Sequence, residues 1–179
     1  MFEPIKNFFR RRAIKKFSRA SATCLLPLSK IKSVNIVIDV EESEWDALKE
    51  DILAWSRSSG IKLGLYFFDF RKLGKDELLL TSIQTTVARR NLNWIGMPAY
   101  DTVAGLIEEP CDLFISLIDN GDFPIDFVSK CSSARFKIGR KAYPGHVFDL
   151  IFSGKSTEGL RSGGRQVFTG IIDFLGKIA

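Results

Sequence analysis

The stretch that decides the fold runs from residue 34 to residue 68 and reads VNIVIDVEESEWDALKEDILAWSRSSGIKLGLYFF. Its beginning, 34–40, is rich in β-branched side chains, which favours a β-strand. Its end, 61–68, is apolar at nearly every position, as in a strand that is covered on both faces. We therefore expect two strands here, and the segment between them decides how they pair.

That segment has the pattern of an amphipathic helix. Its large apolar residues recur at intervals of three and four: Trp45, Leu48, Ile52 and Trp55. Ser43 is available as an N-cap among acidic neighbours that suit the positive end of a helix, and the sequence SSG at 58–60 is a typical stop. Strand, helix and strand together predict a βαβ unit with parallel strands.

The same alternation continues along the chain. Further strands are expected at 111–118, 135–139 and 147–152, and helices at 100–109, at 124–133 and near the C-terminus. Residues 79–87 fit either a strand or a helix, and their threonines favour extended structure. The fold class is thus α/β, a three-layer sandwich with a mainly parallel, Rossmann-like sheet of five to six strands.

Charge divides the chain into two parts. Residues 1–20 hold seven basic side chains and one acidic one, whereas the rest of the chain carries 19 bases and 20 acids. We expect residues 1–33 to form a basic, helical N-terminal arm with a linker, and residues 34–179 to form a single α/β domain. The candidate residues for contact with an anionic surface are Lys6, Arg10, Arg11, Arg12, Lys15, Lys16 and Arg19.

Three interpretations of the arm remain open. It binds anionic lipid headgroups with its phenylalanines at the interface, it binds nucleic acid through phosphates, or its phenylalanines pack on the domain. Phe2, Ile5, Phe9 and Ala13 share one helical face, and Phe8 lies off it. Trp94, in a loop at 91–98, is expected to hold that loop against the core.

Cysteine usage and hydropathy indicate the compartment. The chain of 179 residues has three widely spaced cysteines, no CxxC pair and one histidine, so buried, reduced thiols are expected. No stretch has the length and apolar character of a membrane span. These features predict a cytoplasmic protein, or one at the periphery of a membrane, that needs no metal and no cofactor.

Acidic residues follow three of the expected strands. Asp39, Asp69 and Asp119 come directly after apolar runs, and Asn120 follows the last of them. Because parallel strands place their carboxyl ends at one edge of the sheet, these side chains are candidates for ligand binding there. Carboxylates in this position suit a phosphate bridged by a metal ion, although aspartate is also common in turns.

A glycine-rich loop precedes the last helix. The sequence SGKST at 153–157 resembles part of a phosphate-binding loop, but position 149 is Asp where that motif requires glycine. Lys155, Arg161 and Arg165 still place cations before a helix N-terminus, where an anion can bind. They complete the list of candidate ligand-binding residues.

Two resemblances extend this interpretation. The segments NLNWIGMP at 91–98, CDLFISL at 111–117 and ARFKIG at 134–139 resemble a family of small bacterial α/β proteins with no assigned activity. Residues 111–139 also resemble part of the N-terminal lobe of heptosyltransferases, which need two such lobes, whereas this chain has room for one. The first resemblance implies a domain and no chemistry.

The function expected from the sequence is therefore general. We expect a non-catalytic binding or regulatory module steered by its basic arm, rather than an enzyme. The alternative is a small enzyme that acts on a phosphate-containing or nucleotide ligand at the carboxyl edge of the sheet. No catalytic residue can be assigned from the sequence.

Overall fold

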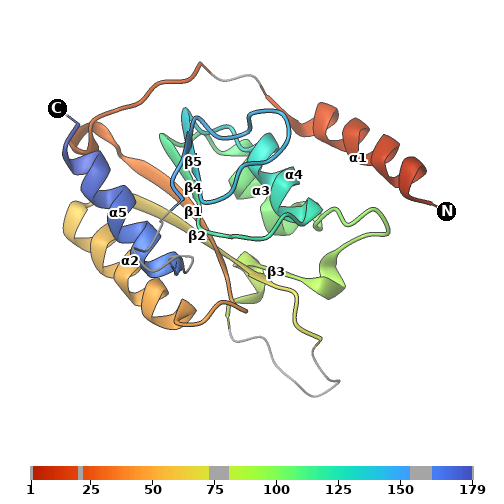
Figure 1. Ribbon diagram of the computed structural model, residues 1–179, viewed down its shortest axis with the longest axis horizontal. Coiled ribbons are helices and arrows are strands. Elements are labelled where there is room, and N and C mark those ends of the chain that lie inside the picture. Colours follow the sequence, from red (N-terminus) through yellow and green to blue (C-terminus); the bar gives the residue numbers. More distant parts are fainter. Residues whose placement is uncertain (1, 20–21, 73–80, 154–162, 179) are drawn as a thin grey trace.

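A six-stranded parallel sheet forms the centre of the molecule (Figure 1). The computed structural model describes residues 2–19, 22–72, 81–153 and 163–178. The strand order is β3-β2-β1-β4-β5-β6, and every neighbouring pair is parallel. The strands are β1 (Ser33–Asp39), β2 (Lys62–Asp69), β3 (Thr86–Ala88), β4 (Leu113–Ser116), β5 (Phe136–Gly139) and β6 (Leu150–Ile151). The expected fold class, a three-layer α/β sandwich with a Rossmann-like sheet, is confirmed.

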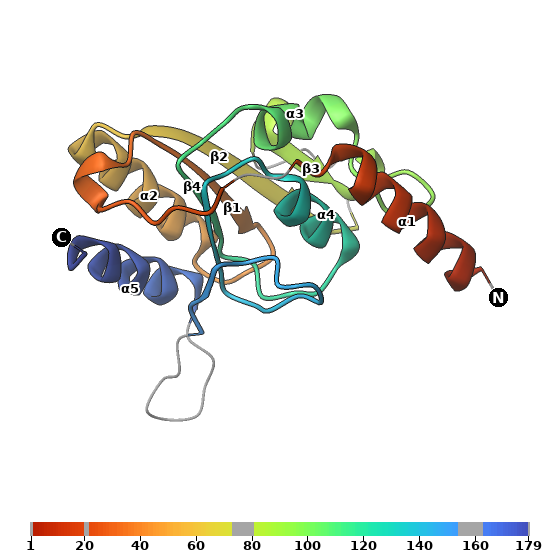
Figure 2. The ribbon, with the colours of Figure 1, turned by 90° about the horizontal axis from the view of Figure 1, so that it is seen from above.

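Helices cover both faces of this sheet (Figure 2). One face carries α2 (Trp45–Ser59) and α5 (Gly164–Gly176), and the other carries α3 (Tyr100–Glu108) and α4 (Phe123–Cys131). A further helix, α1 (Glu3–Phe17), lies outside α3 and α4, at the end of the molecule that holds the N-terminus. The long, continuous apolar runs of the central strands follow from this double cover.

Successive side chains of the central strands pack alternately against the helices on the two faces of the sheet. Ile36 and Ile38 of β1 belong to the same apolar cluster as Leu48 of α2 and Ile171 of α5. Val37, between them in the sequence, belongs to the cluster beneath α3 and α4. Strand geometry requires this alternation, because successive side chains point to opposite faces.

The β1–α2–β2 unit forms as its sequence predicts, with one difference at the helix start. Gly60 ends α2 with a φ of 67°, a left-handed conformation that glycine adopts without strain. The expected N-cap at Ser43 is wrong, because Glu44 precedes the helix in a left-handed conformation with no side-chain cap. Three carboxylates in this connection, those of Glu41, Glu42 and Glu44, instead concentrate negative charge near the helix start.

The expected strand over residues 79–87 is largely absent. Residues 73–80 lie outside the described part of the chain, Ile83–Thr85 form a turn of 3₁₀ helix, and only Thr86–Ala88 pair with β2. The hydroxyl of Thr86 donates to the carbonyl of Ser82 at 2.5 Å, which closes the turn just before the strand. Local threonine chemistry thus competes with strand pairing here.

The strand expected at 147–152 is also shorter than its apolar pattern suggests. Only Leu150–Ile151 pair with β5. Pro144 precedes Gly145 and His146, and these two have φ values of 96° and 51°, so the backbone turns sharply before it can join the sheet. Pairing with β5 therefore begins only at Leu150, near the end of the apolar run.

Candidate functional site

The carboxyl edge of the sheet holds the three aspartates that the sequence singles out. Asp39 ends β1 at the centre, Asp69 ends the neighbouring β2, and Asp119 follows β4 on the other side of β1. In an open sheet with this strand order, the crevice between β1 and β4 is the usual place for a ligand. The partners of each side chain decide what this edge can bind.

Asp39 and Asn120 are brought together between the ends of β1 and β4. The Nδ2 of Asn120 donates to Oδ2 of Asp39 at 3.3 Å, and the backbone N–H of Glu41 donates to Oδ1 at 2.8 Å. Burial raises the pKa of Asp39, and the negative charges of Glu41 and Glu42 add to this effect. The Tyr143 hydroxyl donates to the carbonyl of Asn120 at 2.7 Å and holds the turn in place.

Asp69 and Asp119 each interact with a basic side chain. The buried carboxylate of Asp69 accepts two hydrogen bonds from the guanidinium of Arg71, at 2.8 Å and 2.7 Å, and these bonds hold its pKa below the ordinary value. The carbonyl of Asp119 accepts from the ammonium of Lys141 at 3.5 Å. Among the described residues, no three His, Cys, Asp or Glu side chains form a group that could hold a metal ion.

Of the three cations expected before the last helix, only Arg165 lies in the described part of the chain. Lys155 and Arg161 lie outside the described residues. Arg165, at the start of α5, turns toward α2 and donates to the carboxylate of Asp51, with an Nη2–Oδ1 distance of 3.3 Å. This ion pair joins the two helices on one face of the sheet.

A buried ion pair that sequence reasoning missed occupies the same edge. Nη1 of Arg140 donates to both carboxylate oxygens of Glu42, at 2.7 Å and 2.8 Å, and to the carbonyl of Leu117 at 3.1 Å. The Glu42 carboxylate also accepts from the backbone N–H of Gly164 at 2.8 Å. Glu42 thereby caps α5 and ties together the ends of β1, β4 and β5.

The charges of the described residues at the β1–α2 connection do not favour a phosphate. In related architectures a phosphate binds at the N-terminus of the helix that follows β1. Here the β1–α2 connection carries three glutamates, and Asp46 lies in the first turn of α2. Arg140 is bound to the Glu42 carboxylate at 2.7 Å. Coulomb repulsion would therefore oppose an anion at this position.

The second candidate surface lies at the other end of the molecule, on α1. One side of this helix docks on the domain. Phe17 stacks on Tyr100 of α3, with ring centroids 5.3 Å apart, and meets Phe127 of α4 edge-on. Ala13 and Ile14 join the same apolar cluster, so α1 packs against the two helices on this face.

Arg10 fixes the helix to two further elements. Its Nε donates to the carbonyl of Ile95 at 2.7 Å, and its guanidinium lies over the ring of Phe123, 4.6 Å from the centroid. The docked face of α1 is therefore formed by residues 10, 13, 14 and 17, which follow helical spacing. The face expected from Phe2, Ile5, Phe9 and Ala13 is docked only in part: Ala13 packs on the domain, whereas the three larger side chains are exposed.

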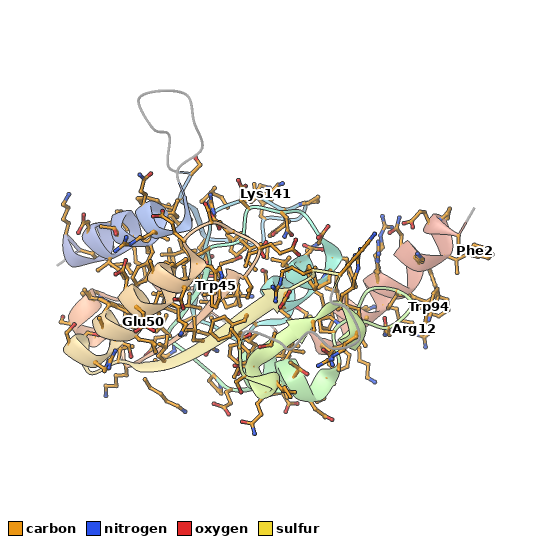
Figure 3. The ribbon with its side chains drawn as sticks, turned by 90° about the horizontal axis from the view of Figure 1, so that it is seen from below. Phe2, Arg12, Trp45, Glu50, Trp94 and Lys141 are labelled. Atoms are coloured by element: carbon orange, nitrogen blue, oxygen red, sulfur yellow. The ribbon has the colours of Figure 1, made fainter. Side chains whose placement is uncertain are left out.

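The rest of α1 leaves large apolar side chains in contact with solvent. Phe2 is 70 % exposed, Phe8 61 % and Ile5 49 %. Trp94 is 60 % exposed and meets Phe9 edge-on at 5.4 Å, so its expected role of holding the loop against the core is wrong. Figure 3 shows Phe2, Arg12 and Trp94 together at the end of the molecule that α1 forms.

Most of the basic side chains of the arm share this exposed surface. Five of them are exposed in the second half of α1 and just after it: Arg11, Arg12, Lys15, Lys16 and Arg19. We name the exposed apolar residues Phe2, Ile5, Phe8 and Trp94, together with these five cations, the α1 surface. The charge pattern of the arm was readable from the sequence, but the contribution of Trp94 arises only because Arg10 and Phe9 contact its loop.

Comparison with known proteins places the chain in a family. No curated protein and no solved structure is significantly similar to it. A family model matches residues 6–160, a range that includes most of α1 and all of the strands. The match covers most of the chain, and its description assigns no activity. The chain therefore belongs to DUF6913, a family of unknown function.

Proposed function

We propose that this protein is a non-catalytic module that attaches to anionic membrane surfaces through its α1 surface. The observation that carries the proposal is the exposure of Phe2, Ile5 and Phe8 on a helix whose opposite side is already docked. Packing on the domain thus accounts for Phe17 and its neighbours but leaves these apolar side chains in water. Such side chains next to a row of cations are typical of helices that lie in a membrane interface.

The location of the charge supports the same function. Residues 1–20 carry seven bases and one acid, while the remainder has one more acid than bases. Each Lys or Arg near an anionic bilayer contributes about 1 kcal/mol of binding free energy, so the five exposed cations would act together. Among the described residues, no helix is long and apolar enough to cross a membrane.

A membrane fits these residues better than a nucleic acid does. A nucleic acid binds the cations of a protein through its phosphates, and it binds aromatic side chains by stacking its bases on them. Ile5 has no ring to stack, and together with Phe2 and Phe8 it exposes apolar area rather than hydrogen-bonding groups. The carboxylates at the β1–α2 connection and the Glu42–Arg140 pair support a non-catalytic role for the carboxyl edge.

The test measures binding of the whole protein to vesicles that contain phosphatidylserine and to neutral vesicles. We expect binding to the anionic vesicles alone, with a steep loss as salt increases. Phe8→Ala should weaken binding about five-fold or more, because roughly 1 kcal/mol or more of apolar burial is lost. Arg12→Gln should weaken binding about five-fold.

Two matched controls lie outside α1. Ile83 is 71 % exposed, so Ile83→Ala removes apolar surface of similar exposure from another part of the molecule. Lys32→Gln removes one exposed charge in the same way. Equal effects of the control and α1 substitutions would contradict the proposal, as would tighter binding to duplex DNA than to the vesicles at the same ionic strength.

A further inference from the structure

An open, cationic groove runs between the second half of α1 and the neighbouring domain. It has a volume of about 470 Å³. Its walls come from α1, from the end of α4 and from the loop that joins β5 to β6. The lining residues that matter here are Arg11, Ile14, Lys15, Ser18, Lys130 and Pro144.

Three of these side chains are cations from two different elements. Arg11 and Lys15 are exposed on α1, one helical turn apart. Lys130 comes from α4, and its ammonium donates to Asp126 at 2.8 Å, which leaves two of its three N–H donors for another acceptor. The groove therefore holds a net positive charge and several donors that converge on one space.

The neighbouring backbone keeps this arrangement in place. The hydroxyl of Ser18 lies 3.5 Å from the carbonyl of Lys130 and joins the end of α1 to α4. A Cβ built on Gly145 would lie 4.0 Å from Cε of Lys130, so this left-handed turn packs along the lysine side chain. Docking of α1 thus creates the groove, and neither α1 nor the domain would form it alone.

The groove is continuous with the apolar part of the α1 surface. Phe8, Arg11 and Lys15 are spaced by three and four residues, so they follow one another along the same side of the helix. A lipid whose acyl chains contact Phe8 would bring its headgroup to Arg11 and Lys15. The adjacent Ile14 and Pro144 supply apolar contacts for the glycerol that carries the phosphate.

We propose that this groove binds the phosphomonoester headgroup of an anionic lipid, with Arg11, Lys15 and Lys130 as its phosphate ligands. A terminal phosphate offers three acceptor oxygens and close to two negative charges, which matches three converging cations. A phosphodiester such as phosphatidylserine has fewer free oxygens and a lower charge at phosphorus. The inference rests on the proposed membrane attachment and adds the class of lipid that the same surface selects.

The experiment compares vesicles of phosphatidic acid with vesicles of phosphatidylserine, adjusted to equal surface potential. Arg11→Gln is paired with Arg12→Gln, because both are exposed arginines of α1 and only Arg11 lines the groove. Lys130→Gln is paired with Lys16→Gln, because both remove a lysine charge and only Lys130 lines the groove. Lys130→Gln removes the ion pair with Asp126 and could disturb folding. Arg11→Gln changes an exposed side chain, so it tests the groove without that complication.

We expect the whole protein to bind phosphatidic acid more tightly than phosphatidylserine. On phosphatidylserine, Arg11→Gln and Arg12→Gln should each weaken binding about five-fold. On phosphatidic acid, Arg11→Gln should weaken binding about ten-fold more than Arg12→Gln does, since it also removes charge-assisted hydrogen bonds to the phosphate. Soluble glycerol 3-phosphate should compete with phosphatidic acid for the whole protein, and less well for the Arg11 variant.

The remaining outcomes separate the two proposals. Equal losses for the paired variants on phosphatidic acid would overturn the groove assignment and leave membrane attachment in place. Absence of binding to either type of vesicle would overturn membrane attachment and, with it, the lipid assignment. Binding of glycerol 3-phosphate without binding of vesicles would identify a free phosphate compound as the ligand and would also overturn the assignment to a lipid.

Discussion

At the scale of single residues, the Glu42–Arg140 pair is the interaction on which the carboxyl edge of the sheet depends. The side chain of Arg140 is 8 % exposed and that of Glu42 is 21 % exposed, so water screens their attraction only in part. Glu42 also accepts from Gly164, which makes one carboxylate the partner of both β5 and α5. Removal of the carboxylate charge would weaken the attraction that offsets the desolvation of a buried guanidinium.

Glu42→Gln should therefore destabilise the protein by about 2 to 3 kcal/mol, a value reduced from that of a fully buried pair. The measurement is equilibrium unfolding in urea. Glu41→Gln is the matched control, because Glu41 is exposed and precedes Glu42 directly. Its effect should stay within about 0.5 kcal/mol. If the two substitutions had equal effects, the pair would not hold this edge together.

At the scale of elements, α1 is joined to the rest of the molecule by few but specific contacts. No residue of α1 is fully buried, yet Ala13, Ile14 and Phe17 pack on the cluster beneath α3 and α4. The core of that cluster consists of side chains from the sheet, α3, α4 and the loops that join them, and none of them comes from α1. We therefore propose that residues 34–179 fold without the arm, as the change in sequence pattern at residue 34 indicates.

Deletion of residues 1–30 should leave a cooperatively folded protein that is less stable by about 2 kcal/mol, because the apolar side chains that are lost, such as Ile14 and Phe17, are only partly buried. Thermal unfolding of the full-length and shortened proteins at equal concentration measures this difference. The double substitution Phe2→Ser with Phe8→Ser is the control, because both side chains are exposed and should change stability little. A broad, non-cooperative transition in the shortened protein would show that the arm belongs to the folding unit.

At the scale of the whole molecule, two of the three cysteines report on the packing of the cluster beneath α3 and α4. All three are free thiols; Cys111 and Cys131 are buried, whereas Cys24 is exposed, so the expectation of buried thiols is wrong for Cys24. Burial raises the pKa of Cys111 to about 11 and that of Cys131 to about 12. At neutral pH both therefore remain protonated, and the thiolate is the reactive form.

A thiol reagent at pH 7 should modify one cysteine of the native protein within the time of the reaction, and Cys24→Ser should abolish that modification. All three thiols should react in denaturant. Because the raised pKa values suppress the thiolate, labelling of Cys111 in the native state should remain slow until the pH approaches 11. Rapid labelling of Cys111 or Cys131 at pH 7 would contradict the packing of the cluster beneath α3 and α4.

Local pattern alone was sufficient for most of the elements. β1, α2 and β2 form where β-branched runs and the three-and-four spacing of Trp45, Leu48, Ile52 and Trp55 place them. Periodicity predicts these elements because it reports which side of a segment is apolar. In a sheet covered by helices on both faces, that apolar side is the side that becomes buried. The short strands β3 and β6 were less predictable, since hydroxyl bonds and left-handed turns limit them.

The functional surfaces depend on tertiary structure to a greater degree. The sequence by itself determined the parallel α/β sandwich and the basic charge of the arm, because both follow from neighbouring residues. Strand order, the pairing of Glu42 with Arg140, and the groove between Arg11 and Lys130 are decided only by the folded chain. The physical reason is that these contacts join residues about a hundred positions apart, and no local periodicity records which distant side chain completes an ion pair or a binding site.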